Sequence, residues 1–471
     1  MIICGAPAWK GRIREGKHGS GEGGLKVDGD AGWGRINWSA AAGIFALSLI
    51  LCVAFARFAK PLSVTDEFLT YYRVATNVAD GMGFTEDGSS PYVYLPPLFS
   101  YALGGWFSLV GSRSLFAVQV YQSLCLALSA FLTFFLAREL FPRSGGTAII
   151  ASLWVAVHPS LWTYAVFVRQ EPTILLVTTL ACWRTVVWLN DPGRVRALLA
   201  GVCWGLATLA KAVTLFLPVF LLFLWAWRGR RDVRMTGSET ALAVIAFLLV
   251  LAPWTARNYL QFQRFIPVND QAAGVLEWNV QHSDAPVDEG KGWVGLLIAQ
   301  LKTKDPAKGE LAGERYLVEL DRAGVKDRER GSRLWSYILS HKKYFLVQRV
   351  RNAIFFAAPG VDWWIQSGRL KTGEAQGSGL FLAAALQFHG ILYLFFFWRL
   401  LLLARGKLDL PMSFLVLFFA LYWGVYTLLW GEIRFSIPVY PVLVLFAPWE
   451  RLMRPKASVA ADGPSIGGLR S

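Results

Sequence analysis

The chain has 471 residues, of which 55% are hydrophobic and only 17% are charged. Soluble globular proteins average about 45–50% apolar and about 25% charged residues, so this composition excludes a soluble enzyme, a disordered chain and a fibrous repeat. The net charge of +15 does not indicate nucleic-acid binding, because the basic residues stand in short clusters between apolar segments, a pattern typical of membrane topology.

Ten apolar segments approach the roughly 20 residues that a membrane-spanning helix needs. They predict an all-α polytopic membrane protein with spans at about 38–58, 114–137, 146–166, 172–190, 197–211, 213–227, 238–256, 380–402, 410–430 and 434–450. A further apolar segment, at 96–111, is shorter and begins with two prolines. We expect it to form an interfacial or re-entrant helix rather than a span.

The distribution of basic residues predicts the orientation of these spans. With the N-terminus in the cytoplasm, almost every basic cluster next to a span falls on the cytoplasmic side, whereas the outer loop at 59–95 contains only Lys60 and Arg73. Cytoplasmic loops carry an excess of Lys and Arg, so both termini are expected in the cytoplasm. The first apolar segment has no cleavage site after it and is interpreted as an uncleaved signal anchor.

This topology divides the chain into parts. They are a flexible basic cytoplasmic tail (1–37), an N-terminal transmembrane module (38–256) with a long first outer loop (59–113), an extracytoplasmic segment (257–379), C-terminal transmembrane helices (380–450) and a second cytoplasmic tail (451–471). Within the outer segment, 333–356 has apolar residues at helical spacing accompanied by basic residues. It predicts either an amphipathic helix on the membrane surface or a packed helix of a small outer domain.

Polar residues gather at the predicted outer ends of the spans. Ionisable groups at membrane depth are costly, and their default interpretation is function with a partner. Two carboxylate clusters and several cations on one face predict a site for an anionic substrate combined with an acid–base step. The residues are Asp66, Glu67, Arg169, Glu171, Lys211, Arg257, Asn258, Glu432 and Arg434.

Each of these residues also has a purely structural interpretation. Asp66 forms a possible capping box with Ser63 at the start of a helix, and Glu171 stands at a helix start, where an acid favours the helix dipole. Lys211 can extend toward the headgroups, and Arg434 can pair with the carboxylate two residues before it. Taken singly, these interpretations are about as good as the functional ones, and the shared location favours function.

Four motifs follow one another along 60–450. The first loop reads Asp66-Glu67, Tyr71-Tyr72, Gly81-Met82-Gly83-Phe84 and Tyr94-Leu95-Pro96-Pro97. The other three read GLATLAK at 205–211, PWTARNY at 253–259 and RFSIPVYP at 434–441. The set resembles the GT-C superfamily of membrane glycosyltransferases, in particular the protein-O-mannosyltransferase-like group (glycosyltransferase family 39 type) that includes the bacterial aminoarabinose transferases. Two places depart from the pattern of that group. Leu95 interrupts its Tyr-Pro-Pro motif, and the sequence around Glu171 differs from its usual second acidic motif.

The resemblance implies a GT-C-like bundle of about ten transmembrane helices with a long first outer loop and a smaller helical outer segment. It implies that Asp66 is catalytic and that Glu171 belongs to a second acidic motif, and Glu67, beside Asp66, is assigned to the catalytic residues as well. The implied donor is a sugar on a polyprenyl phosphate. The implied place of reaction is the extracytoplasmic side of a bacterial inner membrane.

The chemistry expected for such a donor is direct displacement. An acceptor hydroxyl attacks the anomeric carbon, Asp66 takes its proton as general base, and a single displacement inverts the anomeric configuration. The leaving phosphate is a stable anion that needs cations rather than a proton donor, and Lys211, Arg257 and Arg434 suit that task. Three further polar side chains are assigned to the donor or acceptor pocket: Tyr71, Tyr94 and Asn258.

Other functions stay open from the sequence. A glycan polymerase or ligase would use a longer lipid-linked saccharide, a flippase would move the lipid-linked sugar, and a scaffold would retain the fold without the chemistry. No cofactor is required, although a divalent cation held by Asp66 and Glu171 is left open. The expected partners are the lipid-linked donor, membrane lipids and a glycan, lipid or protein acceptor, and nucleic acid is not among them.

Overall fold

The structure is a computed structural model that describes residues 38–58, 66–227, 236–281, 283–285, 290–302, 312–325, 327–357, 376–431 and 433–449. At 66–68, 272–273, 299–302, 327–328, 376–388 and 433, only the backbone is described. Both predicted tails and Glu432 lie outside these residues. Within them, the regular structure is helical apart from an isolated bridge between Thr85 and Pro91, which confirms the all-α prediction.

The N-terminal part contains two loop helices and a series of apolar helices. The loop helices are α2 (Asp66–Ala79) and α3 (Pro97–Val110). The others are α1 (Trp38–Phe58), α4 (Leu115–Leu140), α5 (Gly145–Ala156), α6 (Pro159–Thr163), α7 (Glu171–Asn190), α8 (Arg194–Ala210), the 3-10 helix η1 (Ala212–Phe216), α9 (Leu217–Trp227) and α10 (Gly237–Phe262).

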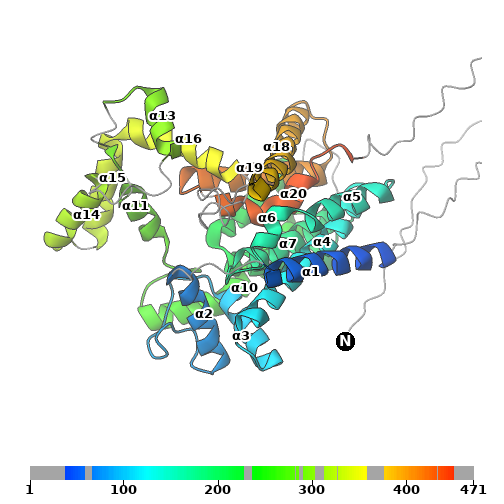
Figure 1. Cartoon of the computed structure of the whole chain (residues 1–471), viewed down its shortest axis with the longest axis horizontal. Helices are drawn as coiled ribbons and strands as arrows, with labels where there is room; N and C mark the ends of the chain where they lie inside the picture. The colour runs from blue at the N-terminus through cyan, green and yellow to red at the C-terminus, as the bar shows by residue number, and fades with distance from the viewer. Residues whose placement is uncertain are drawn as a thin grey trace, which may run out of the picture. The chain divides into compact units, whose positions relative to one another are not determined.

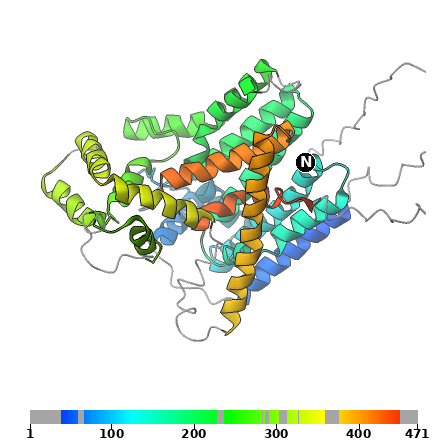
Figure 2. The ribbon, with the colours of Figure 1, turned by 90° about the horizontal axis from the view of Figure 1, so that it is seen from above.

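The outer segment and the C-terminal part are also helical. The outer segment forms α11 (Ala272–Gln281), α13 (Trp293–Lys302), α14 (Ala312–Arg322), α15 (Asp327–Ser340) and α16 (Lys342–Ala357). The C-terminal part forms α18 (Gln376–Ala404), α19 (Leu410–Leu428), the 3-10 helix η3 (Ile433–Val439) and α20 (Tyr440–Val444). Figure 2 shows α18 lying across the helices near it, and it contacts α6, α19 and α20.

Five helices in the described residues are long and apolar enough to cross a membrane: α1, α4, α7, α10 and α19. The predicted span at 146–166 divides at His158 into α5 and α6, and the one at 434–450 divides into η3 and α20. Prolines explain both breaks, because proline lacks the N–H that continues a helix. The count of ten unbroken spans is therefore not confirmed. The segment at 96–111 forms the short helix α3, and its interfacial or re-entrant placement stays a prediction.

Helix directions bring four helix ends together. Near their starts, α4 and α7 are joined by the hydroxyls of Tyr121 and Thr173, 2.9 Å apart, and near their ends Asn190 contacts the Glu139 carbonyl. These two helices therefore run parallel, and α8 returns antiparallel to α7 after a short connection. Gly201 and Gly205 of α8 face 243 and 250 of α10 in the same order, so α8 and α10 are parallel.

We call the shared end of these helices the site end. It consists of the N-terminal ends of α4 and α7, the C-terminal ends of α8 and α10, and the loop helices α2 and α3. Figure 1 shows α2 and α3 beside α10. Gly81 and Gly83 end α2 in a turn with φ of 77° and 75°, a conformation that glycine adopts without strain, and the loop then folds back toward α3.

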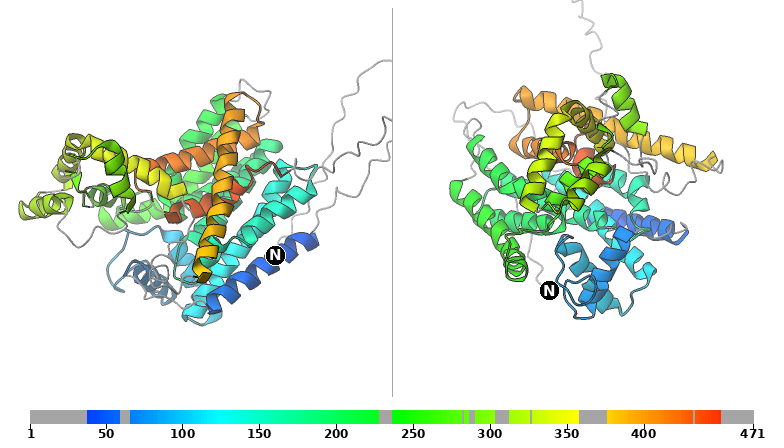
Figure 3. Two further views of the ribbon diagram at one scale, coloured as in Figure 1. Left: turned by 45° about the horizontal axis from the view of Figure 1, so that its top comes forward. Right: turned by 90° about the vertical axis from the view of Figure 1, so that its left-hand side faces the viewer.

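The outer segment has a small apolar core of its own. Leu317 and Leu320 of α14, Leu334 and Tyr337 of α15, and Phe345 of α16 are buried in it. The stacked rings of Trp278 and Trp430, with centroids 4.1 Å apart, join the segment to the chain that follows α19. Figure 3 shows these helices grouped together.

The predicted stripe at 333–356 is not part of that core. Its apolar residues lie on α15 and α16 and are exposed: Trp335, Leu339, Leu346, Val350 and Ile354. The opposite face of each helix packs into the core of the outer segment, as the interpretation of a small outer domain predicted. The apolar stripe faces away from that core. The membrane-surface interpretation of the stripe stays a prediction.

The contact between α8 and α10 generates a stability prediction. A Cβ at Gly201 would overlap the backbone of Ala243, so Gly201→Ala should force the helices apart and lower the free energy of unfolding by about 1–3 kcal/mol. Gly43→Ala in α1 is the matched control, because a Cβ there meets nothing within 4 Å. Thermal unfolding of the purified variants measures the effect, and equal melting temperatures would contradict it.

Candidate functional site

An apolar cluster joins the elements of the site end. Buried or partly buried side chains from the loop helices, the loop between them and four other segments form this site-end cluster: Tyr71, Phe84, Phe99, Val118, Val168, Leu209 and Trp254. Three of its members, Val168, Leu209 and Trp254, stand two or three residues before Glu171, Lys211 and Arg257 in the sequence. The structure therefore brings the predicted ionic positions of α7, α8 and α10 to one end of the bundle.

Glu171 and Arg434 form a buried ion pair at this end. The Arg434 Nε lies 3.8 Å from Glu171 Oε1, and the two side chains are 12% and 3% exposed. The second carboxylate oxygen of Glu171 is buried and accepts no hydrogen bond from the described residues. The pair joins the first turn of α7 to η3 and gives Arg434 a partner other than the neighbouring Glu432 considered from the sequence.

Lys211 approaches the same place from α8. The helix ends at Ala210, and Lys211 continues in an extended conformation with φ −156° and ψ 116°. Its Nζ lies 4.9 Å from the centroid of the Phe435 ring, and the Arg434 Cζ lies 5.4 Å from that centroid. Two cations thus lie near one aromatic ring, and the Glu171 carboxylate pairs with one of them. The excess positive charge of this arrangement suits an anion such as phosphate.

Polar side chains of α4 hold the segment that precedes Glu171. Gln122 donates through Nε2 to the Tyr164 carbonyl at 2.9 Å and accepts the Arg169 N–H at 2.6 Å. Gln119 donates to the carbonyl of Val166 at 3.1 Å. These bonds satisfy buried backbone groups and so fix the start of α7. Neither glutamine is among the residues predicted from the sequence, although two amides three residues apart inside an apolar span are a readable signal.

Arg257 makes its contacts with the first loop. Its guanidinium donates to the carbonyl of Tyr92 at 2.9 Å and to that of Phe84 at 3.3 Å, and its Cζ lies 4.8 Å from the Trp254 ring. These contacts hold the loop on α10. The assignment of Arg257 to the donor phosphate stays a prediction, because the contacts described for Arg257 explain its position by the first loop and Trp254 instead.

The three residues assigned to the substrate pocket have different surroundings. Asn258 is fully buried, donates to the Ile266 carbonyl at 3.0 Å and accepts from Arg257. Tyr71 is buried in the site-end cluster, with its ring 5.5 Å from that of Phe99. Tyr94 is 49% exposed. Of these three, Tyr94 is the one whose side chain is accessible to a substrate.

Asp66 and Glu67 are the first two residues of α2. Their side chains lie outside what the structure describes, so their catalytic assignment stays a prediction. The backbone places Asp66 one turn before Thr70 and two turns before Arg73, because an α-helix has 3.6 residues per turn.

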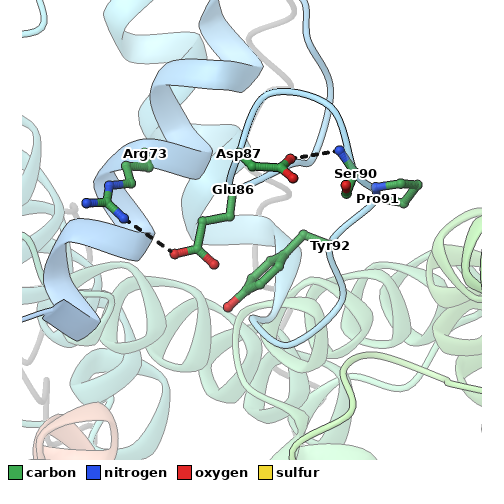
Figure 4. A pocket seen from close by; sticks show the side chains of 6 residues that line it. All are labelled: Arg73, Glu86, Asp87, Ser90, Pro91 and Tyr92. Carbon is green, nitrogen blue, oxygen red and sulfur yellow. Dashed lines mark hydrogen bonds and ion pairs between the residues drawn. The ribbon is translucent and has the colours of Figure 1, made fainter.

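A pocket of about 370 Å³ opens beside α2 (Figure 4). Arg73 of α2 forms one side of it, and the loop forms the rest with Glu86, Asp87, Ser90, Pro91 and Tyr92. These residues are not among those predicted from the sequence, because charged and polar residues in a loop are common and nothing in their spacing distinguishes them. We call this cavity the loop pocket.

The charged groups of the loop pocket are held in place. Glu86 Oε1 accepts the Thr70 hydroxyl at 2.9 Å and lies 3.8 Å from an Arg73 nitrogen. Asp87 Oδ1 accepts the backbone N–H groups of Ser89 and Ser90 at 2.9 and 2.7 Å. These N–H groups hold the pKa of Asp87 well below its usual range, so the carboxylate is ionised at neutral pH.

Tyr92 completes the wall of the loop pocket. Partial burial of the ring, together with the nearby charge of Glu86, raises the pKa of Tyr92 above its usual value. The phenol therefore stays protonated and can donate a hydrogen bond. Figure 4 shows Tyr92 extending toward Glu86.

The described side chains contain no group of three His, Cys, Asp or Glu residues that could hold a metal ion. Asp66, the expected partner of Glu171 in a cation site, is not among those side chains. A divalent cation held by Asp66 and Glu171 therefore stays a possibility from the sequence.

Residues 95–256 match the family described as dolichyl-phosphate-mannose-protein mannosyltransferase. No curated protein sequence matches the chain. The match covers about a third of the chain and includes α3, α4, α7, α8 and most of α10.

Solved structures share the fold. The archaeal oligosaccharyltransferase AglB from Archaeoglobus fulgidus, in complex with an inhibitory peptide and a dolichol-phosphate, superposes with a TM-score of 0.50 at 14% identity, over 87% of this chain and 50% of that one. Its apo form gives 0.50 at 15% identity with the same coverage. ArnT from Cupriavidus metallidurans bound to undecaprenyl phosphate gives 0.42 at 14% identity, over 87% and 78%, a similarity too low to argue from.

The chain therefore has the architecture of the GT-C membrane glycosyltransferases, as the sequence motifs implied. Residues 95–256 are similar to the protein-mannosyltransferase family. The chain spans about half the length of the oligosaccharyltransferase that it matches, and at this identity the likeness is one of fold.

The ion pair generates a second prediction. Removing one partner of a buried pair leaves an uncompensated charge and costs about 3–5 kcal/mol, so Arg434→Met should lower the melting temperature strongly. The double variant Glu171→Gln with Arg434→Met should recover most of the loss. Arg196→Met is the control, because its pair with Asp191 is exposed and contributes about 0–1 kcal/mol. Equal melting of Arg434→Met and Arg196→Met would contradict the role of the pair.

Proposed function

We propose that the protein is an inverting glycosyltransferase that moves a sugar from a polyprenyl-phosphate donor to an acceptor hydroxyl on the extracytoplasmic side of the membrane. The observation that carries the proposal is that Lys211 and Arg434 both lie near the ring of Phe435, with Glu171 paired to Arg434. It occurs in a GT-C fold, at the bundle end to which α2 and its first residue, Asp66, also belong.

In this proposal the donor phosphate binds between Lys211 and Arg434. A lipid-linked phosphate lies at headgroup level while its tail remains in the bilayer, so its binding groups belong at the ends of spanning helices. Lys211 follows α8 directly, and Arg434 follows α19 after a short connection. Glu171 holds the Arg434 guanidinium in position without neutralising both cations.

The reaction proceeds by one displacement. The acceptor oxygen bonds to the anomeric carbon as the bond from that carbon to the phosphate oxygen breaks, and the electron pair leaves on the lipid phosphate. Asp66 takes the proton of the acceptor hydroxyl. Lys211 and Arg434 stabilise the charge that develops on the leaving oxygen, so neither an acid for the leaving group nor a covalent enzyme intermediate is needed.

Arg257 has a different task in this proposal. Its bonds to the carbonyls of Phe84 and Tyr92 support a positioning role, in which it holds the first loop against α10. The orientation proposed is the one that the basic clusters predict, with the site end facing the extracytoplasmic side of a bacterial inner membrane and both termini in the cytoplasm. Deleting the gene and analysing which polyprenyl-phosphate sugar accumulates would identify the donor.

The role of Asp66 is tested by Asp66→Asn. Loss of a positioned base lowers the rate by about 10²–10⁴-fold, so this variant should lose transfer from radiolabelled undecaprenyl-phosphate sugars while its melting temperature stays unchanged. Glu67→Gln is the matched control at the next residue and should retain more activity. Full activity of Asp66→Asn would remove Asp66 from the mechanism.

The phosphate site is tested by Lys211→Ala. Loss of a charge-assisted contact should raise KM for the lipid donor by about tenfold or more while KM for the acceptor changes little. Arg196→Ala, at the opposite end of the bundle, should change neither value. Equal increases in the two KM values of Lys211→Ala would argue against a phosphate contact.

A further inference from the structure

The loop pocket has no role in the reaction proposed above. Its walls come from α2 and the first loop, whereas the cations assigned to the donor phosphate lie directly after α8 and in η3. Its volume of about 370 Å³ falls within the range of about 300–1,000 Å³ that is usual for small-molecule sites.

The polar groups of the loop pocket include both hydrogen-bond acceptors and donors. The carboxylates of Asp87 and Glu86 accept, the guanidinium of Arg73 donates, and the hydroxyls of Ser90 and Tyr92 do both. Asp87 accepts two backbone N–H groups and is also contacted by the hydroxyls of Ser89 and Ser90. A ligand hydroxyl that bonds to this carboxylate can take the place of a serine hydroxyl, which is free to rotate to another partner. Sugar hydroxyls, which also donate and accept, complement such a wall.

Apolar surface accompanies these groups. The ring of Tyr92 and the side chain of Pro91 lie among them (Figure 4), and a sugar ring offers C–H groups to such a surface. A divalent cation suits the pocket less well, because the positively charged Arg73 already lies 3.8 Å from Glu86. The chemistry therefore favours a sugar over a metal ion.

The pocket is held rigid by groups outside it. Tyr92 donates its backbone N–H to the Phe84 carbonyl at 3.0 Å, and Arg257 bonds to the carbonyls of both residues. Asn77, which is buried in α2, donates to the carbonyls of Thr85 and Glu86 at 3.0 and 3.2 Å. A preorganised wall of this kind loses little entropy when a ligand binds.

The position along α2 relates the pocket to the proposed reaction. Arg73 follows Asp66 by seven residues, which is about 10 Å along a helix that rises about 1.5 Å per residue. An acceptor larger than a single sugar can therefore occupy the pocket while one of its hydroxyls lies near Asp66.

We propose that the loop pocket binds a sugar residue of the acceptor, so that the acceptor is a glycan or glycoconjugate. The inference rests on the proposed transfer reaction and adds the acceptor class to it. Asp87 and Tyr92 provide specificity by bonding to the hydroxyls of that sugar, and Arg257 is a positioning residue for the loop that carries both.

Binding is tested on the full-length protein in nanodiscs with a panel of methyl glycosides of common hexoses and pentoses, by saturation-transfer NMR. We expect at least one glycoside to bind. Asp87→Asn, which keeps an oxygen for the loop N–H groups, should weaken that binding about tenfold, and Tyr92→Phe about fivefold. Asp80→Asn is the control, because Asp80 pairs with Arg113 in the same outer loop and does not line the pocket.

Three results would overturn the proposal. One is that no glycoside of the panel binds, and another is that Tyr92→Phe and Asp87→Asn bind as the unaltered protein does. The third is calorimetric binding of Mg²⁺ or Ca²⁺ that Asp87→Asn abolishes, since it would assign the pocket to a cation. Hydrogen exchange of 82–94 shows whether Asp87→Asn opens the loop, and if it does, Tyr92→Phe decides.

A kinetic measurement separates acceptor from donor. Asp87→Asn should raise KM for the acceptor and leave KM for the lipid donor unchanged, and the opposite split would assign the pocket to the donor sugar. Glycoside binding does not require transfer. If the protein binds a glycoside but transfers no sugar, the proposed function alone is contradicted. If sugar transfer is the same in Asp87→Asn and Tyr92→Phe as in the unaltered protein, this inference alone is contradicted.

Discussion

The buried ion pair between Glu171 and Arg434 is the contact on which the arrangement of the site end depends. Each charge is almost out of contact with solvent, and removing an ion from water costs several kcal/mol unless a partner remains close. The pair therefore holds the start of α7 against η3, while the amides of α4 hold the segment before it. Lys211 joins the pair through Phe435, so three elements that are distant in the sequence share one electrostatic environment.

The site end contains two kinds of polar surface separated by apolar packing. The cations around Phe435 suit a phosphate, whereas the loop pocket has mixed donors and acceptors that suit hydroxyl groups. Residues of the site-end cluster lie next to both surfaces in the sequence. In the proposed reaction this division allows a lipid-linked donor and a sugar acceptor to approach one carboxylate, Asp66, from different elements.

Most of the helices could be predicted from the sequence, since hydropathy and proline positions are local properties. Each predicted span contains helical structure, but those at 146–166, 213–227 and 434–450 are divided into shorter helices, and five helices in the described residues are long and apolar enough to cross a membrane. The sequence predicted that Glu171, Lys211 and Arg434 lie at the same end of the bundle, but it did not predict which of them are in contact. Arg257 shows why, because the carbonyls that it binds lie 165 and 173 residues away in the chain, beyond any pattern of spacing.

The sequence by itself determined that the chain is a polytopic helical membrane protein and that its ionic residues gather at the ends of helices, because a helix in lipid needs a continuous segment of about 20 apolar residues, which is visible in the order of the amino acids. Only the tertiary structure decided which charges meet, that Asn258 and Tyr71 are buried, and that Arg73, Glu86, Asp87 and Tyr92 enclose a pocket. Those outcomes depend on helix directions and loop closure, which join residues through space and leave no local trace in the order of the amino acids.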